Sequence, residues 1–308
     1  MISILMATYN GERFIKEQIE SLLKQTVLDF KLYINDDKST DSTYLILQNY
    51  ANNHPDKIFV SQNEKNSGSA KDNFFQMMIN HKDDYIMLCD QDDVWLPDKI
   101  EKSLYKIKEL EEQHGASKPL LVYTDLEVVD ENLNTISKSY FNTEDINNKK
   151  KTLNKIVARN ITTGCTVMYN RALAELIKEN PEFMIMHDWW LTLIACAFGD
   201  ADTIYEPTVL YRQHSDNEIG VVKVKTLSHM LHKLINYKEA KKVLNDTYAQ
   251  AASFLIMYKD KLSKEQVEFL SKFCDIPNHN KVFRWIMICR LGVLKKGILR
   301  KISSFIFI

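Results

Sequence analysis

Three carboxylates lie within four positions of one short stretch, CDQDDVW, at residues 89–95. Asp90, Asp92 and Asp93 follow directly on an apolar run that ends at Leu88. Carboxylates this close repel one another unless a cation lies among them or water screens their charge. In an extended segment, Asp90 and Asp92 would point the same way because one residue separates them. The stretch is therefore either a metal site or an acidic loop in solvent, and the surrounding sequence must decide between the two.

The segments that would position these carboxylates alternate between strand and helix patterns. Strands are expected at residues 2–8, 30–36, 57–62, 84–90, 120–125, 163–170, 202–206 and 209–214. Helices are expected up to about Gln25, at 40–53 and 69–81, after Pro97 and at 187–199. Strands separated by helices predict a mostly parallel sheet with right-handed crossovers. Residues 128–137 are expected to form a turn or hairpin, 142–152 a polar loop or lid, and those after about 224 only helices, with an amphipathic piece at 227–237.

Polar clusters follow the first four of these strands at the same end. They are Thr8, Tyr9 and Asn10, then Asp36 and Asp37, then Asn66, Ser67 and Gly68, then residues 90–93. In an open parallel sheet these strand ends share one edge, where ligands bind. Four polar clusters on one edge favour a binding site over four independent loops.

Each cluster also has a purely structural interpretation. Asp36 and Asp37 could form a turn before the next helix, with Ser39 or Thr40 as its cap. Gly68 could be a turn glycine, and Asp92 or Asp93 could be solvated loop carboxylates. The sequence contains neither GxxxxGK[ST] nor GxGxxG, so the common phosphate-binding loops are absent.

The length and composition suit one large α/β domain with an appendage, or two small domains. The chain has 308 residues, of which 45% are hydrophobic and 26% charged. Its five cysteines are odd in number and form no CxxC pair, so a disulfide framework or a zinc site is not expected and a reducing cytoplasm fits. The N-terminus has no basic region before its short apolar stretch, so no signal peptide is expected.

The charge is distributed unevenly along the chain. Residues 221–308 hold 17 Lys and Arg against 6 Asp and Glu, whereas residues 1–220 hold 23 against 35. Residues 281–308 hold seven basic residues, no acid, and aromatic residues among aliphatic ones. They lack the ~20 uninterrupted apolar residues of a spanning helix, so a helix lying on an anionic membrane fits better. Nucleic acid is disfavoured because this tail is too apolar; a helical hairpin packed on the catalytic domain or on a second copy remains the alternative.

Four stretches in order resemble the family 2 glycosyltransferases, which have the GT-A fold. They are ILMATYNGERFIKEQIESLLKQT, YINDDKSTDST, NEKNSGSAKDNF and MLCDQDDVW. The resemblance covers about residues 1–215 and implies an α/β, Rossmann-like nucleotide-diphospho-sugar transferase fold: a mostly parallel sheet with a C-terminal helical region. It places a catalytic domain at 1–220, with nucleotide-sugar binding at about 1–115 and the acceptor side at about 116–220, and a helical region at 221–308. CDQDDVW, with the later HDWW and YRQH, is most similar to bacterial rhamnosyltransferases that build cell-wall or capsular polysaccharide.

The family pattern implies a role for each matching residue. The nucleotide-sugar contacts would be Thr8, Tyr9, Glu12, Asp36, Asp37, Gly68, Lys71, Asp90 and Gln91. Asp90, Asp92 and His214 would bind the metal, and Asp188 would be the general base, although His187 stands where the family has Glu. The acceptor side would include Trp189, Trp190, Thr163 and Gly164.

The implied reaction needs a metal and a base. Mg²⁺ or Mn²⁺ held by Asp90 and Asp92 would neutralise the leaving diphosphate, and a nitrogen ligand from His214 would favour Mn²⁺. The attacking sugar hydroxyl needs a base, and direct attack inverts the anomeric carbon. Asp188 could instead cap its helix, His214 could be a core-edge histidine, and Trp189 or Trp190 could pack the core rather than stack on a sugar.

The resemblance therefore predicts an inverting, metal-dependent glycosyltransferase. Its donor would be a nucleotide-diphosphate sugar, first of all dTDP-rhamnose, and its acceptor a hydroxyl of a glycan or lipid-linked glycan at the inner face of the cell membrane. A homodimer is a further expectation. The two rival functions are a nucleotidyltransferase that makes a nucleotide-sugar and a non-catalytic, membrane-recruited nucleotide-binding module.

Overall fold

A computed structural model of the chain describes residues 1–144, 146, 151–214 and 237–293. The chain divides into two compact units. The first comprises Met1–Asn147, Thr162–Asn180 and Gly199–Val222, and the second comprises Asn148–Ile161, Pro181–Phe198 and Lys223–Ile308. Two segments before residue 220 thus group with the C-terminal residues, while the predicted functional boundary at residue 220 stays a prediction.

Among the described residues, the first unit contains one nine-stranded sheet with the order β3-β2-β1-β4-β8-β6-β9-β5, and β7 pairs with β6. The strands are β1 (Ile2–Thr8), β2 (Phe30–Asp36), β3 (Ile58–Gln62), β4 (Tyr85–Cys89), β5 (Val94–Trp95), β6 (Leu120–Val129), β7 (Thr135–Ser137), β8 (Val167–Asn170) and β9 (Asp200–Arg212). Strands β3, β2, β1 and β4 are mutually parallel, β8 is antiparallel to both its neighbours, and β9 runs parallel to β6. The predicted mostly parallel sheet is confirmed.

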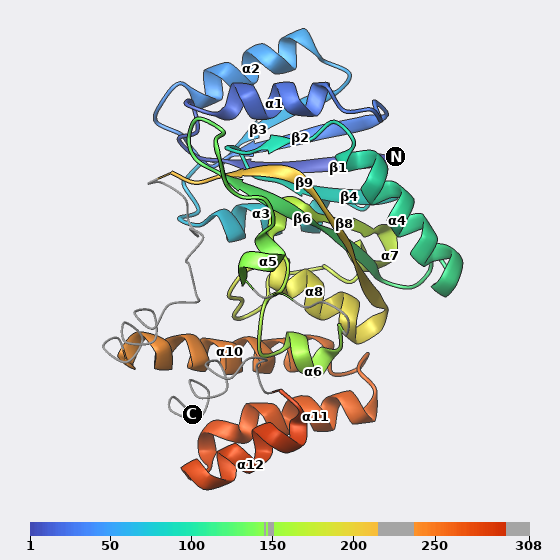
Figure 1. The fold of residues 1–308 in the computed structure, drawn as a ribbon, viewed down its shortest axis with the longest axis vertical. Helices are drawn as coiled ribbons and strands as arrows, with labels where there is room; N and C mark the ends of the chain where they lie inside the picture. Colours follow the sequence, from blue (N-terminus) through green and yellow to red (C-terminus); the bar gives the residue numbers. More distant parts are fainter. Residues whose placement is uncertain (145, 147–150, 215–236, 294–308) are drawn as a thin grey trace. The chain divides into compact units, whose positions relative to one another are not determined.

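Helices cover both faces of the parallel part of the sheet. They include α1 (Ile15–Leu23), α2 (Thr43–Asn53), α3 (Ala70–Asn80) and α4 (Lys99–His114). Every residue of β1 is buried, as expected for an apolar strand with cover on both sides. Alternate residues of β1 pack in one cluster with α1, α2 and α4, and α3 lies on the other side of the sheet from α1 and α2 (Figure 1). These layers direct the carboxyl ends of β1, β2 and β4 to one edge.

Several expected elements differ in detail from the structure. Residues 163–170 begin with a 3₁₀ turn at Gly164–Thr166, so only their second half forms strand β8. The two short strands expected at 202–214 are one strand, β9, whose pairing shifts register near Pro207, where the missing N–H is tolerated. The start of the expected loop at 142–152 belongs to helix α5 (Tyr140–Glu144), and residues 145 and 147–150 lie outside the described residues.

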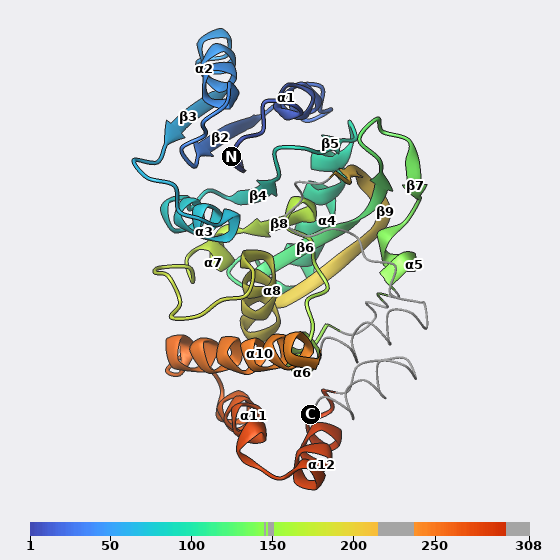
Figure 2. The same cartoon turned by 90° about the vertical axis from the view of Figure 1, so that its left-hand side faces the viewer.

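The second unit is helical in its described part. It contains α6 (Leu153–Ile156), α8 (His187–Phe198), α10 (Tyr237–Tyr258), α11 (Lys264–Asp275), a 3₁₀ turn (Ile276–Asn278) and α12 (Lys281–Leu291), whereas the short α7 (Arg171–Ala174) belongs to the first unit. A capping box of Ser263 and Gln266 starts α11, and Gly292 ends α12 in a left-handed conformation. Figure 2 shows α10, α11 and α12 following one another.

Two expectations for the C-terminal region concern residues that the structure does not describe. The amphipathic helix expected at 227–237 and residues 294–308 of the basic tail lie outside the described residues, except for Tyr237. Within the described residues, no helix has both the length and the apolar character needed to cross a membrane.

Candidate functional site

The acidic stretch connects two strands of the first unit and bends between them. Strand β4 ends at Cys89, the chain bends at Gln91 and Asp92, and β5 then pairs antiparallel with β9. The segment is therefore not extended, because β5 must turn to reach β9. As a result Asp90, Asp93 and Cys165 bring their possible ligand atoms within 4.8 Å of one another, the sole trio of this kind among the described residues.

Asp92 forms a pair with His214. The Asp92 Oδ2 atom lies 2.8 Å from His214 Nε2, and both side chains are largely buried. The His214 ring also packs against Phe14, with ring centroids 5.0 Å apart. Two neighbouring ligands of an octahedral ion, each at about 2.1 Å, lie about 3 Å apart. The structure thus brings two of the three predicted metal ligands to a separation that suits one shared ion, and the full ligand set stays a prediction.

The charges around this pair also fit a divalent cation. Asp93 is completely buried, and its Oδ2 atom has no hydrogen-bond partner among the described residues. Burial, and after it the neighbouring carboxylates of Asp92 and Asp90, raise the pKa of Asp93 well above its usual value. Burial also raises the pKa of Cys165 and lowers that of Lys99 to about 8. A divalent cation beside Asp90 and Asp92 would offset the repulsion that these carboxylates exert on one another.

Asp36 is bound entirely from within the protein. Its carboxylate accepts hydrogen bonds from Thr8 Oγ1 at 3.2 Å, from the backbone N–H of Ser39 at 2.9 Å, from Ser39 Oγ, and from Gln62 Nε2 at 2.8 Å. Because Asp36 is also fully buried, it stabilises the turn that follows β2. These contacts agree with the interpretation that Asp36 forms a turn before the next helix. A direct contact of Asp36 with a nucleotide stays a prediction.

Asp37 holds the loop that follows β3. Its carboxylate accepts from Asn63 Nδ2 at 2.6 Å, from the backbone N–H of Ser67 at 2.8 Å and from Ser67 Oγ at 2.7 Å. In this loop Gly68 has a φ of +82°, a conformation that side chains other than glycine rarely adopt. Lys71 follows in the first turn of α3 and is partly buried. The second and third polar clusters are thus joined, as their shared edge predicts.

Gln91 joins the acidic stretch to the first polar cluster. Its side-chain amide accepts from the Tyr9 N–H at 2.9 Å and donates to the Tyr9 carbonyl at 2.9 Å. The sequence interpretation missed the contribution of Gly11, where an added Cβ would lie 2.3 Å from Gln91 Oε1. Nearby, Glu12 accepts from the backbone N–H of Ser42 at 2.8 Å, which ties β1 to the start of α2. All four polar clusters therefore belong to one connected edge of the first unit.

The predicted acceptor residues are divided between the units. Thr163 and Gly164 begin the turn before β8 in the first unit, and the Thr163 carbonyl accepts from the N–H and Oγ1 of Thr166. In the second unit, Trp190 is completely buried and packs against Phe254 and Tyr258. Trp190 is therefore a core residue in the structure, and its burial does not support a contact with an acceptor.

Asp188 lies in the first turn of α8 in the second unit. Its Oδ1 accepts from Asn160 Nδ2 at 3.1 Å and from the Trp189 N–H at 2.6 Å. Trp189 is also mostly buried, and its Nε1–H donates to the Ile156 carbonyl at 2.7 Å. Burial lowers the pKa of His187, the neighbour of Asp188, to about 3, so this imidazole is neutral near pH 7. The role of Asp188 as a base stays a prediction.

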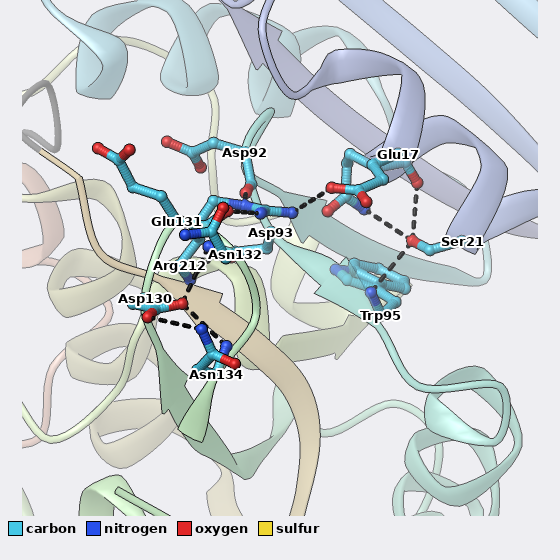
Figure 3. Close-up of polar contacts among 11 residues, drawn as sticks. Glu17, Ser21, Asp92, Asp93, Trp95, Asp130, Glu131, Asn132, Asn134 and Arg212 are labelled. Carbon is cyan, nitrogen blue, oxygen red and sulfur yellow. Dashed lines mark hydrogen bonds and ion pairs between the residues drawn. The ribbon is translucent and has the colours of Figure 1, made fainter. Parts of the chain in front are cut away.

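The largest omission of the sequence interpretation is Arg212. Figure 3 shows its side chain lying between Asp92, Asp93, Glu131 and Glu17, which come from three different segments. Within the motif YRQH, the family pattern implies a role for His214 alone. In the sequence, an arginine inside an apolar strand is only a weak indication of a functional role. Arginine is rarely fully buried without partners, so such a position predicts that the side chain is paired.

Comparisons with known proteins agree with this geometry. The family model described as Glycosyl transferase family 2 matches residues 3–177. The protein named dTDP-rhamnosyl transferase RfbG from Shigella flexneri is 28% identical over 261 residues, which cover 78% of this chain and 83% of the relative.

Two solved structures are also similar. S. aureus TarS 1–349 in complex with UDP-GlcNAc has a TM-score of 0.57 at 17% identity, over 99% of this chain and 90% of that one. The mannosyltransferase PcManGT from Pyrobaculum calidifontis, in complex with GDP-Man and Mn²⁺, has a TM-score of 0.53 at 14% identity, over 99% and 83%. At these identities the likeness concerns the fold.

Proposed function

The chain belongs to glycosyl transferase family 2 and has the GT-A fold, and on this premise we propose that it is a metal-dependent, inverting enzyme. It would transfer a sugar from a nucleotide-diphosphate donor to a hydroxyl of a growing cell-surface polysaccharide. The observation that supports this proposal is the contact between Asp92 and His214 in the acidic stretch that follows β4, on the same edge of the sheet as Asp36, Asp37 and the Gly68 loop.

The residues of this edge have distinct tasks in the proposed reaction. Asp92, His214 and Asp90 would hold Mg²⁺ or Mn²⁺, which neutralises the charge that develops on the departing diphosphate. Gln91 fixes the acidic stretch to Tyr9, so the carboxylates are already oriented before a donor binds. The Gly68 loop, held by Asp37, would lie against the nucleotide together with Thr8, Glu12 and Lys71.

Asp188 would take the proton from the acceptor hydroxyl. A sugar hydroxyl is too weakly acidic to attack unaided, so a carboxylate within hydrogen-bond reach is needed. The hydrogen bonds from Asn160 Nδ2 and from the Trp189 N–H orient Oδ1 of Asp188. Attack in one step from the face opposite the diphosphate gives inversion, and the acceptor would also contact Thr163 and Gly164.

For the donor we favour dTDP-rhamnose, which is supported by the likeness to the Shigella flexneri dTDP-rhamnosyl transferase over most of both chains. A thermal-shift panel of dTDP-rhamnose, UDP-GlcNAc and GDP-Man, each with Mn²⁺ or Mg²⁺, tests this choice. A ligand that binds only the folded state raises the melting temperature, so dTDP-rhamnose should give the largest increase and EDTA should remove it. A larger increase with another donor would overturn the rhamnose assignment.

The products distinguish the rival functions. Transfer releases a nucleoside diphosphate, whereas release of pyrophosphate would favour a nucleotidyltransferase. Donor binding without transfer to any glycan and without slow donor hydrolysis would favour a non-catalytic module.

The acceptor would be a lipid-linked glycan at the cytoplasmic face of the membrane, reached through residues 281–308. In the described part of this tail, α12 exposes the apolar residues Val282, Phe283, Trp285 and Ile286. Lys281, Arg284 and Arg290 lie on the same helix, and no acidic residue follows Asp275. Exposed apolar side chains among basic ones match the apolar and anionic layers of a membrane surface.

Vesicle flotation tests this part of the proposal. The protein should float with vesicles that contain anionic phosphatidylglycerol, and much less with neutral phosphatidylcholine vesicles. Replacing Phe283 and Ile286 together by serine should reduce flotation several-fold, whereas Ile256→Ser, an exposed position on α10, should not. Equal flotation of both variants, or a dimer that the tail substitution dissociates, would instead indicate that this tail packs on protein.

A further inference from the structure

Arg212, the last residue of β9, is a buried arginine that contacts the acidic stretch twice. Only 2% of the residue is exposed. Its Nε atom donates to the Asp92 carbonyl at 2.8 Å, and its backbone N–H donates to Asp93 Oδ1 at 3.1 Å. The bend at residues 91–92 is therefore held from its inner side by one residue of a neighbouring strand.

The two remaining nitrogens of the guanidinium bind other segments of the first unit. Nη1 donates to the Glu131 carbonyl, and Nη2 forms an ion pair with the Glu17 carboxylate of α1. The turn that presents Glu131 is itself held by Asp130, which accepts from the backbone N–H groups of Asn132 and Asn134 (Figure 3). Arg212 thus connects the acidic stretch to two other segments, helix α1 and the turn that contains Glu131.

Phe14 links Arg212 to His214. The guanidinium carbon of Arg212 lies 4.6 Å from the Phe14 ring centroid, and the His214 ring lies 5.0 Å from the same centroid. His214 follows Arg212 by two residues and contacts Asp92 through its side chain. Arg212 therefore holds the backbone of Asp92 while Phe14, the ring that Arg212 also contacts, supports the histidine that binds the Asp92 carboxylate.

From these contacts we propose that Arg212 is a positioning residue for the Asp92–His214 pair. This inference rests on the proposed metal-dependent function, for which that pair supplies two ligands. In this role the guanidinium acts through its contacts with the carbonyl of Asp92 and with the Phe14 ring that packs on His214. Arginine is required because three donors in one rigid plane serve three acceptors in different directions, which one lysine ammonium cannot do.

The experiment measures Mn²⁺ binding rather than turnover alone. Mn²⁺ is titrated in the presence of dTDP or UDP and followed by the relaxation of water protons. Outer residues that orient metal ligands typically contribute 10- to 100-fold to affinity, so Arg212→Lys should weaken Mn²⁺ binding by about this factor. Excess Mn²⁺ should then restore most of the transfer rate, whereas a merely structural defect would not be rescued in this way.

Arg171→Lys is the matched control. Arg171 also forms an ion pair in the first unit, with Asp84 at 3.0 Å, but both side chains are more than half exposed. Its substitution should change neither the Mn²⁺ affinity nor the melting temperature. An Arg212→Lys variant that is folded and binds Mn²⁺ as the wild type does would overturn the proposal.

A second variant decides the question if Arg212→Lys does not fold. Phe14→Leu keeps an apolar side chain but removes the ring that Arg212 and His214 share, so it should weaken Mn²⁺ binding several-fold. Wild-type affinity in this variant would also overturn the proposal. Failure of the wild-type protein to bind Mn²⁺ is a different result, because it would remove the metal-dependent function itself and this inference with it.

Discussion

Replacing Asp92 by asparagine should lower kcat/KM for sugar transfer at least about a thousandfold, which corresponds to about 4 kcal/mol of transition-state stabilisation. The physical reason is the loss of a negative ligand at the point where the diphosphate charge must be neutralised. Asparagine keeps an oxygen that can accept from His214, so the pair at 2.8 Å can persist. Initial rates across a Mn²⁺ titration, together with the melting temperature, measure the effect.

Asp98→Asn is the control for this substitution. Asp98 lies six residues further along the chain and forms an exposed ion pair with Lys102 at 2.8 Å. Such surface pairs contribute about 1 kcal/mol or less to stability and have no role in the proposed reaction. Wild-type rates in Asp92→Asn, or undiminished transfer in excess EDTA, would contradict the metal assignment.

Replacing Asp188 by asparagine should lower kcat by about 10²- to 10⁴-fold and leave donor binding unchanged, because a general base contributes a factor of this size. Asparagine can keep its oxygen at the position that accepts from Asn160 and from the Trp189 N–H, so α8 should stay intact. Single-turnover rates with saturating donor measure the loss, and the affinity for Mn²⁺ with the nucleoside diphosphate measures donor-side binding.

The Asp188 prediction is checked against Asp260→Asn, an exposed acid of the same unit, which should behave as the wild type. The anomeric configuration of the product, determined by NMR, should be opposite to that of the donor. A fully active Asp188→Asn variant would mean that another group takes the proton, and a product of retained configuration would exclude the one-step route.

The parallel half of the fold could be predicted well from the sequence. Strands β1 and β2 coincide residue for residue with the expected 2–8 and 30–36, because an apolar run bounded by polar residues marks a strand covered on both faces. The prediction of a strand at 163–170 was only half correct. The first half forms a 3₁₀ turn and the second half forms the antiparallel strand β8, and the residues of the two halves are similar in type. The grouping of α8 with the C-terminal helices was not expected, because local patterns carry no information about distant packing.

The sequence predicted which residues belong to the candidate site better than it predicted the contacts between them. The edge that gathers Thr8, Asp37 and Asp92 follows from strand order alone. The spacing argument for Asp90 and Asp92 assumed a straight segment and missed the bend, which depends on how β5 pairs with β9. The interpretation of Asp93 as a solvated loop carboxylate is wrong, because Asp93 is completely buried and accepts a hydrogen bond from the backbone N–H of Arg212.

The sequence by itself determined the type of sheet, the edge on which polar residues collect and the family to which the chain belongs. These follow from local order along the chain, where apolar strands, helices and polar strand ends alternate. Only the tertiary structure decided that Asp36 is occupied by internal donors, that His214 pairs with Asp92, and that Arg212 holds the acidic bend. Such contacts join residues far apart in the chain, and hydrogen-bond directions between them exist only once the strands are packed.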